Sequence, residues 1–160
     1  MNHPPEIGEI ISISPIEDDH SALAEILRCT DTAHTPVAWR MHTAPALESA
    51  LPLLRESAIP IVVCERELGS HTWKNVLAEL MKLPNPPLLI VTSRHADNYL
   101  WAEALNMGAY DVLAKPFYAE EVVRVLSHAW ARKADSGTQW MPEAECAVAA
   151  GAFSASLDLW

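Results

Sequence analysis

Charged and hydroxyl side chains stand shortly after four apolar segments of the chain. They are three consecutive acidic residues, a glutamate, a threonine followed by a serine, and a lysine: Glu17, Asp18, Asp19, Glu65, Thr92, Ser93 and Lys115. Carboxylates can hold a cation, hydroxyls can donate to an anionic group, and a lysine ammonium can neutralise one. These side chains form one site only if the preceding segments are neighbouring strands whose carboxyl ends share an edge of a sheet.

Five short segments of apolar and β-branched residues predict buried strands, at residues 10–13, 37–42, 59–64, 88–92 and 110–114. The third is almost continuously apolar, which is typical of a strand buried on both faces. An amphipathic segment with apolar residues at helical spacing follows each strand. Because parallel strands need right-handed crossover connections, the pattern predicts an α/β domain with a doubly wound, five-stranded parallel sheet.

Capping and breaking residues give the expected limits of the helices. Asp18 or Asp19 is expected to cap the first helix, and Gly108 to provide a left-handed residue after the fourth. Pro52 lies inside the second helix and predicts a short or kinked helix, because proline lacks an amide hydrogen. The fifth helix is expected to run from Glu120 to about residue 132.

The composition of the chain changes near its end. Residues 1–133 predict one domain, and residues 134–160 form a C-terminal tail that is rich in small residues. Within this tail, residues 142–150 are compatible with a short alanine-rich helix.

The charge and the cysteines of the chain indicate its partners and its compartment. Acidic residues outnumber basic ones, 21 against 11, for a net charge of −10, and no basic cluster exists, so we expect no nucleic-acid partner. Three well-separated cysteines without a CxxC pair indicate a reducing compartment. The sequence begins without a signal peptide pattern and has no apolar run long enough for a bilayer. We therefore expect a cytoplasmic protein without membrane contact.

Two segments carry a resemblance to a known family. Residues 87–93 read PLLIVTS, and residues 108–117 read GAYDVLAKPF. A hydroxyl after the fourth strand, combined with Lys-Pro-Phe after the fifth, resembles the response regulator receiver domain of two-component signalling. The resemblance covers about residues 8 to 132, is weaker in the first half, and implies the flavodoxin-like (βα)5 receiver fold.

The resemblance also implies roles for the residues of the site. In receiver domains, an acidic pair after the first strand and an aspartate after the third hold Mg²⁺, and that aspartate accepts a phosphoryl group from a histidine kinase. The hydroxyl and the lysine then bind the phosphoryl oxygens, whose charge must be neutralised. Thr92 and Lys115 match these last two positions, with Ser93 in place of Thr92 if the register is shifted by one residue.

The sequence departs from the family pattern at the metal and acceptor positions. Ser14 and Pro15 stand where the acidic pair is expected, and the acidic cluster Glu17, Asp18 and Asp19 comes slightly later. These acids either fold back toward the metal position or form a solvated helix N-terminus, where the helix dipole favours negative charge. We expect no cofactor, and Mg²⁺ only if the acids fold back.

Glu65 stands at the phosphoacceptor position in place of aspartate. Its side chain is one methylene longer, so its carboxylate would reach into the space of a phosphoryl group. We hypothesise a permanent ion pair between Glu65 and Lys115 that mimics the phosphorylated state. The alternative is an exposed glutamate in a surface loop.

A third departure concerns the fifth strand, where Val112 replaces the aromatic switch residue of many receivers. Tyr110 lies two residues earlier and is expected on the same strand face, where it either substitutes for that residue or simply packs. Exposed aromatic residues often dominate interface energies. Trp101, Tyr110 and Tyr118 are therefore candidate anchors for a partner on the surface formed by the fourth helix, the fifth strand and the fifth helix.

These features together predict an atypical receiver domain, a pseudo-receiver, that signals by protein–protein contact and without phosphorylation. The expected partner is a histidine kinase or a downstream output protein, with at most a weak homodimer. One alternative is a phosphoacceptor receiver with a non-standard metal and acceptor site. A second alternative is a small enzyme that uses Cys64 at the end of the third strand, although the adjacent Glu65 disfavours a reactive thiolate.

Overall fold

Five strands form one parallel sheet in the order β2-β1-β3-β6-β7. Their bounds are β1 Glu6–Ile13, β2 Val37–Ala44, β3 Ile61–Glu65, β6 Leu88–Ser93 and β7 Asp111–Ala114. The computed structural model describes residues 4–30 and 37–140. All pairings in this sheet are parallel, which confirms the predicted α/β fold with a doubly wound, five-stranded sheet.

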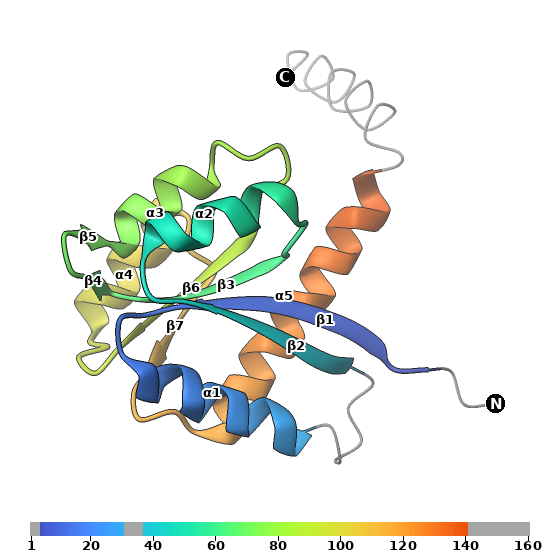
Figure 1. Ribbon diagram of the computed structural model, residues 1–160, viewed down its shortest axis with the longest axis horizontal. Coiled ribbons are helices and arrows are strands. Elements are labelled where there is room, and N and C mark those ends of the chain that lie inside the picture. Colours follow the sequence, from blue (N-terminus) through green and yellow to red (C-terminus); the bar gives the residue numbers. More distant parts are fainter. Residues whose placement is uncertain (1–3, 31–36, 141–160) are drawn as a thin grey trace, which may run out of the picture. The chain divides into compact units, whose positions relative to one another are not determined.

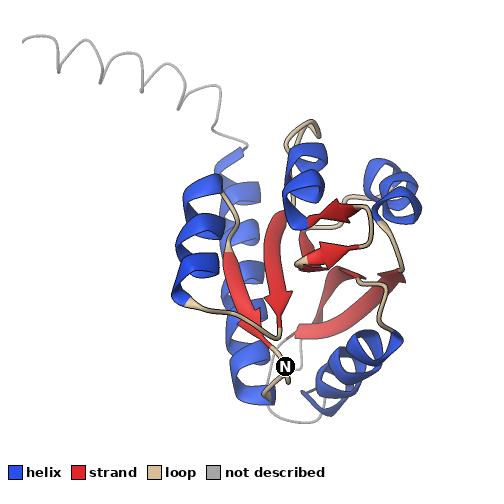
Figure 2. Ribbon diagram, turned by 90° about the vertical axis from the view of Figure 1, so that its left-hand side faces the viewer, coloured by secondary structure: helices blue, strands red, loops and turns tan. Residues whose placement is uncertain are grey.

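Helices cover both faces of the sheet (Figure 1; Figure 2). One layer contains α2 (Leu47–Glu56), α3 (Trp73–Leu80) and α4 (Asn98–Met107), and the other contains α1 (Glu17–Thr30) and α5 (Ala119–Trp140). The chain divides into two compact units, residues 1–130 and 131–160. Only residues 119–130 of α5 lie in the first unit and belong to this layer.

Two hydrophobic clusters fill the space between the sheet and its helical layers. Val62 and Cys64 of β3 belong to the cluster under α2, α3 and α4, whereas Ile61 and Val63 belong to the cluster under α1 and α5. All four side chains are buried. The almost continuous apolar character of this strand therefore reflects burial on both faces, as the sequence predicts.

Two of the expected helix limits are wrong. The first helix begins at Glu17, so Asp18 and Asp19 lie inside its first turn and do not cap it. Negative charge is still favourable there because of the helix dipole. The fifth helix continues past Arg132 to Trp140, and the intervening residues contain no proline that would end it.

Two other predictions about the helices are confirmed. The second helix is a short one of 10 residues that contains Pro52. Gly108 ends the fourth helix with a left-handed φ of 111°, a conformation that costs little without a Cβ atom.

A small antiparallel hairpin follows β3 and was not predicted. It pairs β4 (Glu67–Leu68) with β5 (His71–Thr72) through a turn in which Gly69 has a φ of 74°. Strands of two residues are too short to produce a recognisable alternation of apolar and polar side chains. The hairpin leads directly from the end of β3 to α3.

The predicted helix at residues 142–150 lies outside the described residues, and the domain boundary at residue 133 stays a prediction. Within the described ranges, none of the helices combines the length and the hydrophobicity that a membrane span requires.

Candidate functional site

The carboxyl ends of the strands bring the predicted polar residues together at one edge of the sheet. Glu65, the last residue of β3, pairs in register with Thr92 of β6. The backbone amide of Lys115, just after β7, donates a hydrogen bond of 3.0 Å to the carbonyl of Ser93. Parallel pairing therefore collects Glu65, Thr92 and Lys115 at one place, as expected for a doubly wound sheet.

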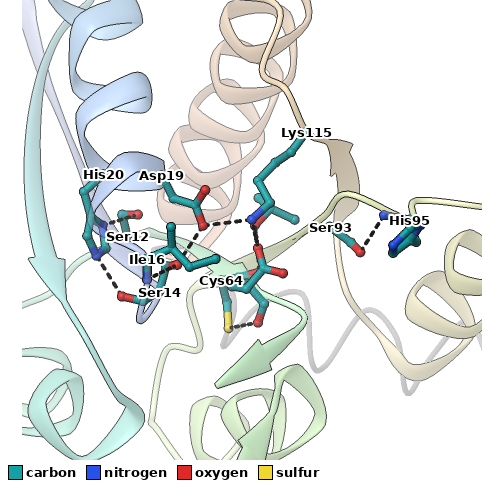
Figure 3. A network of polar contacts seen from close by, with 11 residues as sticks. Ser12, Ser14, Ile16, Asp19, His20, Cys64, Ser93, His95 and Lys115 are labelled. Carbon is teal, nitrogen blue, oxygen red and sulfur yellow. Dashed lines mark hydrogen bonds and ion pairs between the residues drawn. The ribbon is translucent and has the colours of Figure 1, made fainter. Parts of the chain in front are cut away.

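The Lys115 ammonium lies between two carboxylates (Figure 3). Its Nζ atom is 2.5 Å from Glu65 Oε2 and 2.9 Å from Asp19 Oδ2. The lysine side chain is 5% exposed, and those of Glu65 and Asp19 are 12% and 11% exposed. The hypothesised ion pair between Glu65 and Lys115 is thus present, and Glu65 is not an exposed surface residue.

Thr92 completes the surroundings of the Glu65 carboxylate. Its Oγ1 hydroxyl is buried and donates a hydrogen bond of 3.1 Å to Glu65 Oε2, the same oxygen that contacts Lys115. Ser93, the alternative candidate, instead accepts a hydrogen bond from the backbone amide of His95 at 3.0 Å. Of the two hydroxyl groups, that of Thr92 is therefore the one that contacts the Glu65 carboxylate.

The three acidic residues at the start of α1 have different surroundings. Asp19 is buried, and its Oδ2 accepts hydrogen bonds from Ser14 Oγ at 2.7 Å and from Lys115 Nζ at 2.9 Å. Glu17 and Asp18 are exposed. One acid of the cluster thus folds back toward the site, and the other two lie at a solvated helix N-terminus.

A buried histidine fixes the turn between β1 and α1, and sequence reasoning missed it. His20 Nδ1 lies 2.9 Å from Ser12 Oγ, and His20 Nε2 lies 2.9 Å from the carbonyl oxygen of Ser14 (Figure 3). Because a carbonyl only accepts, Nε2 carries a hydrogen. The ring therefore clamps the backbone of Ser14, whose side chain contacts Asp19. In the sequence, the position of His20 next to Asp19 was the only feature that could have indicated this contact.

Cys64 does not have the surroundings of a reactive thiol. Its side chain is fully buried in the hydrophobic cluster under α2, α3 and α4. Burial, and secondarily the charge of Glu65, raises the pKa of the Cys64 thiol far above its usual range. The thiolate that nucleophilic chemistry requires is therefore strongly disfavoured at this position.

The expectation that Tyr110 shares the strand face of Val112 is wrong. Val112 packs in the cluster under α2, α3 and α4, whereas Tyr110 packs against the cluster on the opposite face. The reason is that β7 begins at Asp111, so Tyr110 lies outside the strand and its alternation does not apply. Tyr110 packs and does not substitute for a switch residue near Val112.

A pocket of about 370 Å³ opens beside Lys115, lined by Asp18, Asp19, Ala22, Arg94, Lys115, Pro116 and Phe117. The pocket reaches Lys115 and Asp19, whereas Glu65 and Thr92 are not among its lining residues.

The residues of the site do not fit the Mg²⁺ ion that the resemblance implies. Ser14 and Pro15 replace the expected acids, and the two carboxylates that remain, Asp19 and Glu65, are both bound to Lys115. In the described part of the chain, no group of three or more His, Cys, Asp or Glu residues is placed to hold a metal ion. Mg²⁺ prefers six oxygen ligands at about 2.0–2.1 Å, a set that this site does not offer.

Comparison of the sequence with known proteins is consistent with this fold. A family model for the response regulator receiver domain matches residues 15–127. The transcriptional regulatory protein FixJ of Azorhizobium caulinodans is 24% identical over 131 residues, which cover 82% of this chain and 60% of that protein. The chain therefore spans less than two thirds of the length of this relative.

Solved structures of receiver domains have a similar fold. The beryllofluoride-activated NtrC4 receiver domain dimer is similar with a TM-score of 0.68 and 22% identity, over 78% of this chain and 98% of that one. The receiver domain of NtrX from Brucella abortus has a TM-score of 0.63 and 25% identity, over 75% and 96%. Receiver domains are signalling modules and not enzymes. Since the family model matches most of the sequence and the sheet order is that of the fold, this chain belongs to the response regulator receiver domain family.

Proposed function

We propose that this chain is a receiver domain that signals through protein–protein contact without accepting a phosphoryl group. One observation carries the proposal: the carboxylate at the acceptor position is already bound to both the lysine and the hydroxyl of the site. Glu65 Oε2 lies 2.5 Å from Lys115 Nζ and 3.1 Å from Thr92 Oγ1.

The chemistry of phosphorylation explains why this contact matters. In a phosphorylated receiver, the lysine and the hydroxyl bind oxygens of the phosphoryl group. Here the longer Glu65 side chain supplies an oxygen to both, so the two groups are engaged in the unmodified protein. The ammonium needed to neutralise an incoming phosphoryl group is already neutralised. The site thus resembles the phosphorylated arrangement permanently.

The surface around α4 is suited to the proposed protein contact. Trp101 and Leu105 lie one turn apart on α4 and are 40% and 43% exposed, and Tyr118, after β7, is 65% exposed. Tyr110 is only partly accessible, which makes it a weaker anchor. Aromatic side chains often act as anchors in interfaces. The partner, a kinase or an output protein, the weak homodimer and the cytoplasmic location stay predictions.

Incubation with acetyl phosphate and Mg²⁺ tests this function. We expect intact-mass spectrometry to show no phosphoryl adduct on the wild-type chain, while a receiver domain with the usual acceptor aspartate gains one under the same conditions. A labile adduct on a carboxylate of this chain would instead support the alternative of a phosphoacceptor with a non-standard site.

A further inference from the structure

The pocket beside Lys115 is assembled from three elements at the carboxyl edge of the sheet. Asp18 lies on α1, Arg94 directly follows β6, and Phe117 lies in the segment after β7. The volume of about 370 Å³ falls within the range of small-molecule sites, about 300–1,000 Å³. In open α/β sheets, ligands bind in crevices outside the carboxyl ends of the strands. The pocket therefore has the size and the place of a ligand site.

Two side chains of opposite charge line this pocket and are not paired. Arg94 carries a guanidinium and Asp18 a carboxylate, and both residues are exposed. In the described part of the chain, neither side chain forms an ion pair or a hydrogen bond, with the other or with a third group. The other two charged residues of the lining, Asp19 and Lys115, already bind each other. Among the described residues, the pocket thus offers one cation and one anion that are too far apart to neutralise each other.

The rest of the lining is apolar. It consists of Ala22, Pro116 and Phe117, and Phe117 also packs against the hydrophobic cluster under α1 and α5. A few charged groups on an apolar wall are typical of sites that bind and orient a small molecule.

The charges of the lining indicate the class of ligand. A purely anionic ligand on Arg94 would be repelled by Asp18, and a purely cationic one on Asp18 would be repelled by Arg94. A fitting ligand carries an anion, a cation and an apolar group that can pack on Phe117. At neutral pH, an α-amino acid with an apolar side chain combines these three features.

We propose that this pocket binds a free α-amino acid with an apolar side chain, whose carboxylate contacts Arg94 and whose ammonium contacts Asp18. The inference rests on the proposed function, because a receiver that responds without accepting a phosphoryl group requires another input. Asp19 and Lys115 line the same pocket, so the bound ligand lies beside the ion pairs of the strand-end site.

NMR titration of the ¹⁵N-labelled full chain with L-phenylalanine tests the inference. Phenylacetate lacks the ammonium and phenethylamine lacks the carboxylate, so these two analogues probe the two charges of the ligand separately. Arg94→Gln and Asp18→Asn remove the matching charges from the protein. Arg124→Gln is the matched control, because Arg124 is also an exposed arginine without an ion pair in the described residues, and it does not line the pocket.

We expect L-phenylalanine to cause saturable shifts of the backbone amide signals of Asp18, Arg94 and Phe117. Each analogue should bind at least about tenfold more weakly, because it lacks one charge-assisted hydrogen bond. Arg94→Gln and Asp18→Asn should each weaken binding of L-phenylalanine by a similar factor. Asp18→Asn should also lose the preference for L-phenylalanine over phenylacetate, and Arg124→Gln should bind as the wild-type chain does.

Three results would overturn the inference. The first is the absence of saturable shifts at about 10 mM L-phenylalanine, ten times a Kd of about 1 mM. The second is binding that neither Arg94→Gln nor Asp18→Asn weakens, and the third is equal affinity for L-phenylalanine and phenylacetate. These results leave the proposed function standing, whereas an acetyl phosphate adduct on the wild-type chain refutes that function whatever the titration shows.

Discussion

Replacement of Lys115 by methionine should destabilise this domain far more than loss of an ordinary surface ion pair. Methionine keeps most of the apolar volume of the lysine but removes the charge that Asp19 and Glu65 share. Removing one partner of a buried ion pair costs about 3–5 kcal/mol, because the other charge stays behind uncompensated. Here two carboxylates stay behind, so we expect a loss of at least about 3 kcal/mol in the free energy of unfolding.

The pair of Lys74 with Glu103 provides the comparison within the same chain. The Lys74 side chain is 46% exposed and that of Lys115 is 5% exposed. Exposed ion pairs contribute about 0–1 kcal/mol, because water screens the charges. Lys74→Met should therefore lower the free energy of unfolding by less than about 1 kcal/mol.

Urea unfolding followed by tryptophan fluorescence measures both variants, and Glu65→Gln completes a double-mutant cycle. The Lys115→Met/Glu65→Gln variant carries one buried carboxylate fewer than Lys115→Met. It should recover about 0.5–3 kcal/mol, the range of coupling energies for residues in one network. A cost of less than about 1 kcal/mol for Lys115→Met, or a coupling near zero, would refute the view that this site is a tightly held charge cluster.

Three further predictions concern residues around the site. His20→Ala should lower the free energy of unfolding by about 1–3 kcal/mol in urea titrations, because both ring hydrogen bonds of a buried side chain are lost. An unchanged urea midpoint would contradict the role of His20 as a clamp. In the native protein at neutral pH, thiol reagents should label the exposed Cys29 and leave Cys64 unlabelled, because burial raises the Cys64 pKa and so suppresses its thiolate. Labelling of Cys29 and Cys64 at equal rates would disprove this. Trp101→Ser should change the free energy of unfolding by no more than about 0.5 kcal/mol, because the side chain is exposed. The same variant should weaken binding to a partner or to a second copy of the chain in sedimentation or titration experiments. Undiminished binding would exclude this side chain as an anchor.

The fold and half of the site follow from local patterns in the sequence. The apolar strands and the alternation with helices are sufficient for the parallel sheet, and the sheet then fixes where strand ends meet. Thr92 and Lys115 could be predicted because Thr92 lies near the end of one strand and Lys115 directly follows another, and the pattern locates both strands well. The contact of Glu65 with Lys115 could be predicted from charge and side-chain length.

Other parts of the site depend on geometry that no local pattern encodes. Three consecutive acids have the same chemistry, and only the start of α1 at Glu17 decides that Asp19 is the one directed at the lysine. His20 reaches back to β1 from α1, a tertiary contact between residues whose types alone give no signal. The face of Tyr110 was predicted wrongly because Tyr110 lies just before β7, where the alternation of strand side chains does not apply.

The most direct test of the central claim is NMR observation of the Lys115 ammonium. Of the four lysines in the chain, Lys74 and Lys82 are largely exposed, and the protons of exposed ammonium groups exchange rapidly with water near neutral pH. We expect a protected ammonium signal in ¹⁵N-labelled wild-type protein that disappears in Lys115→Met and shifts in Glu65→Gln. Absence of a protected signal, or a signal that Glu65→Gln leaves unchanged, would contradict a permanent ion pair between Glu65 and Lys115.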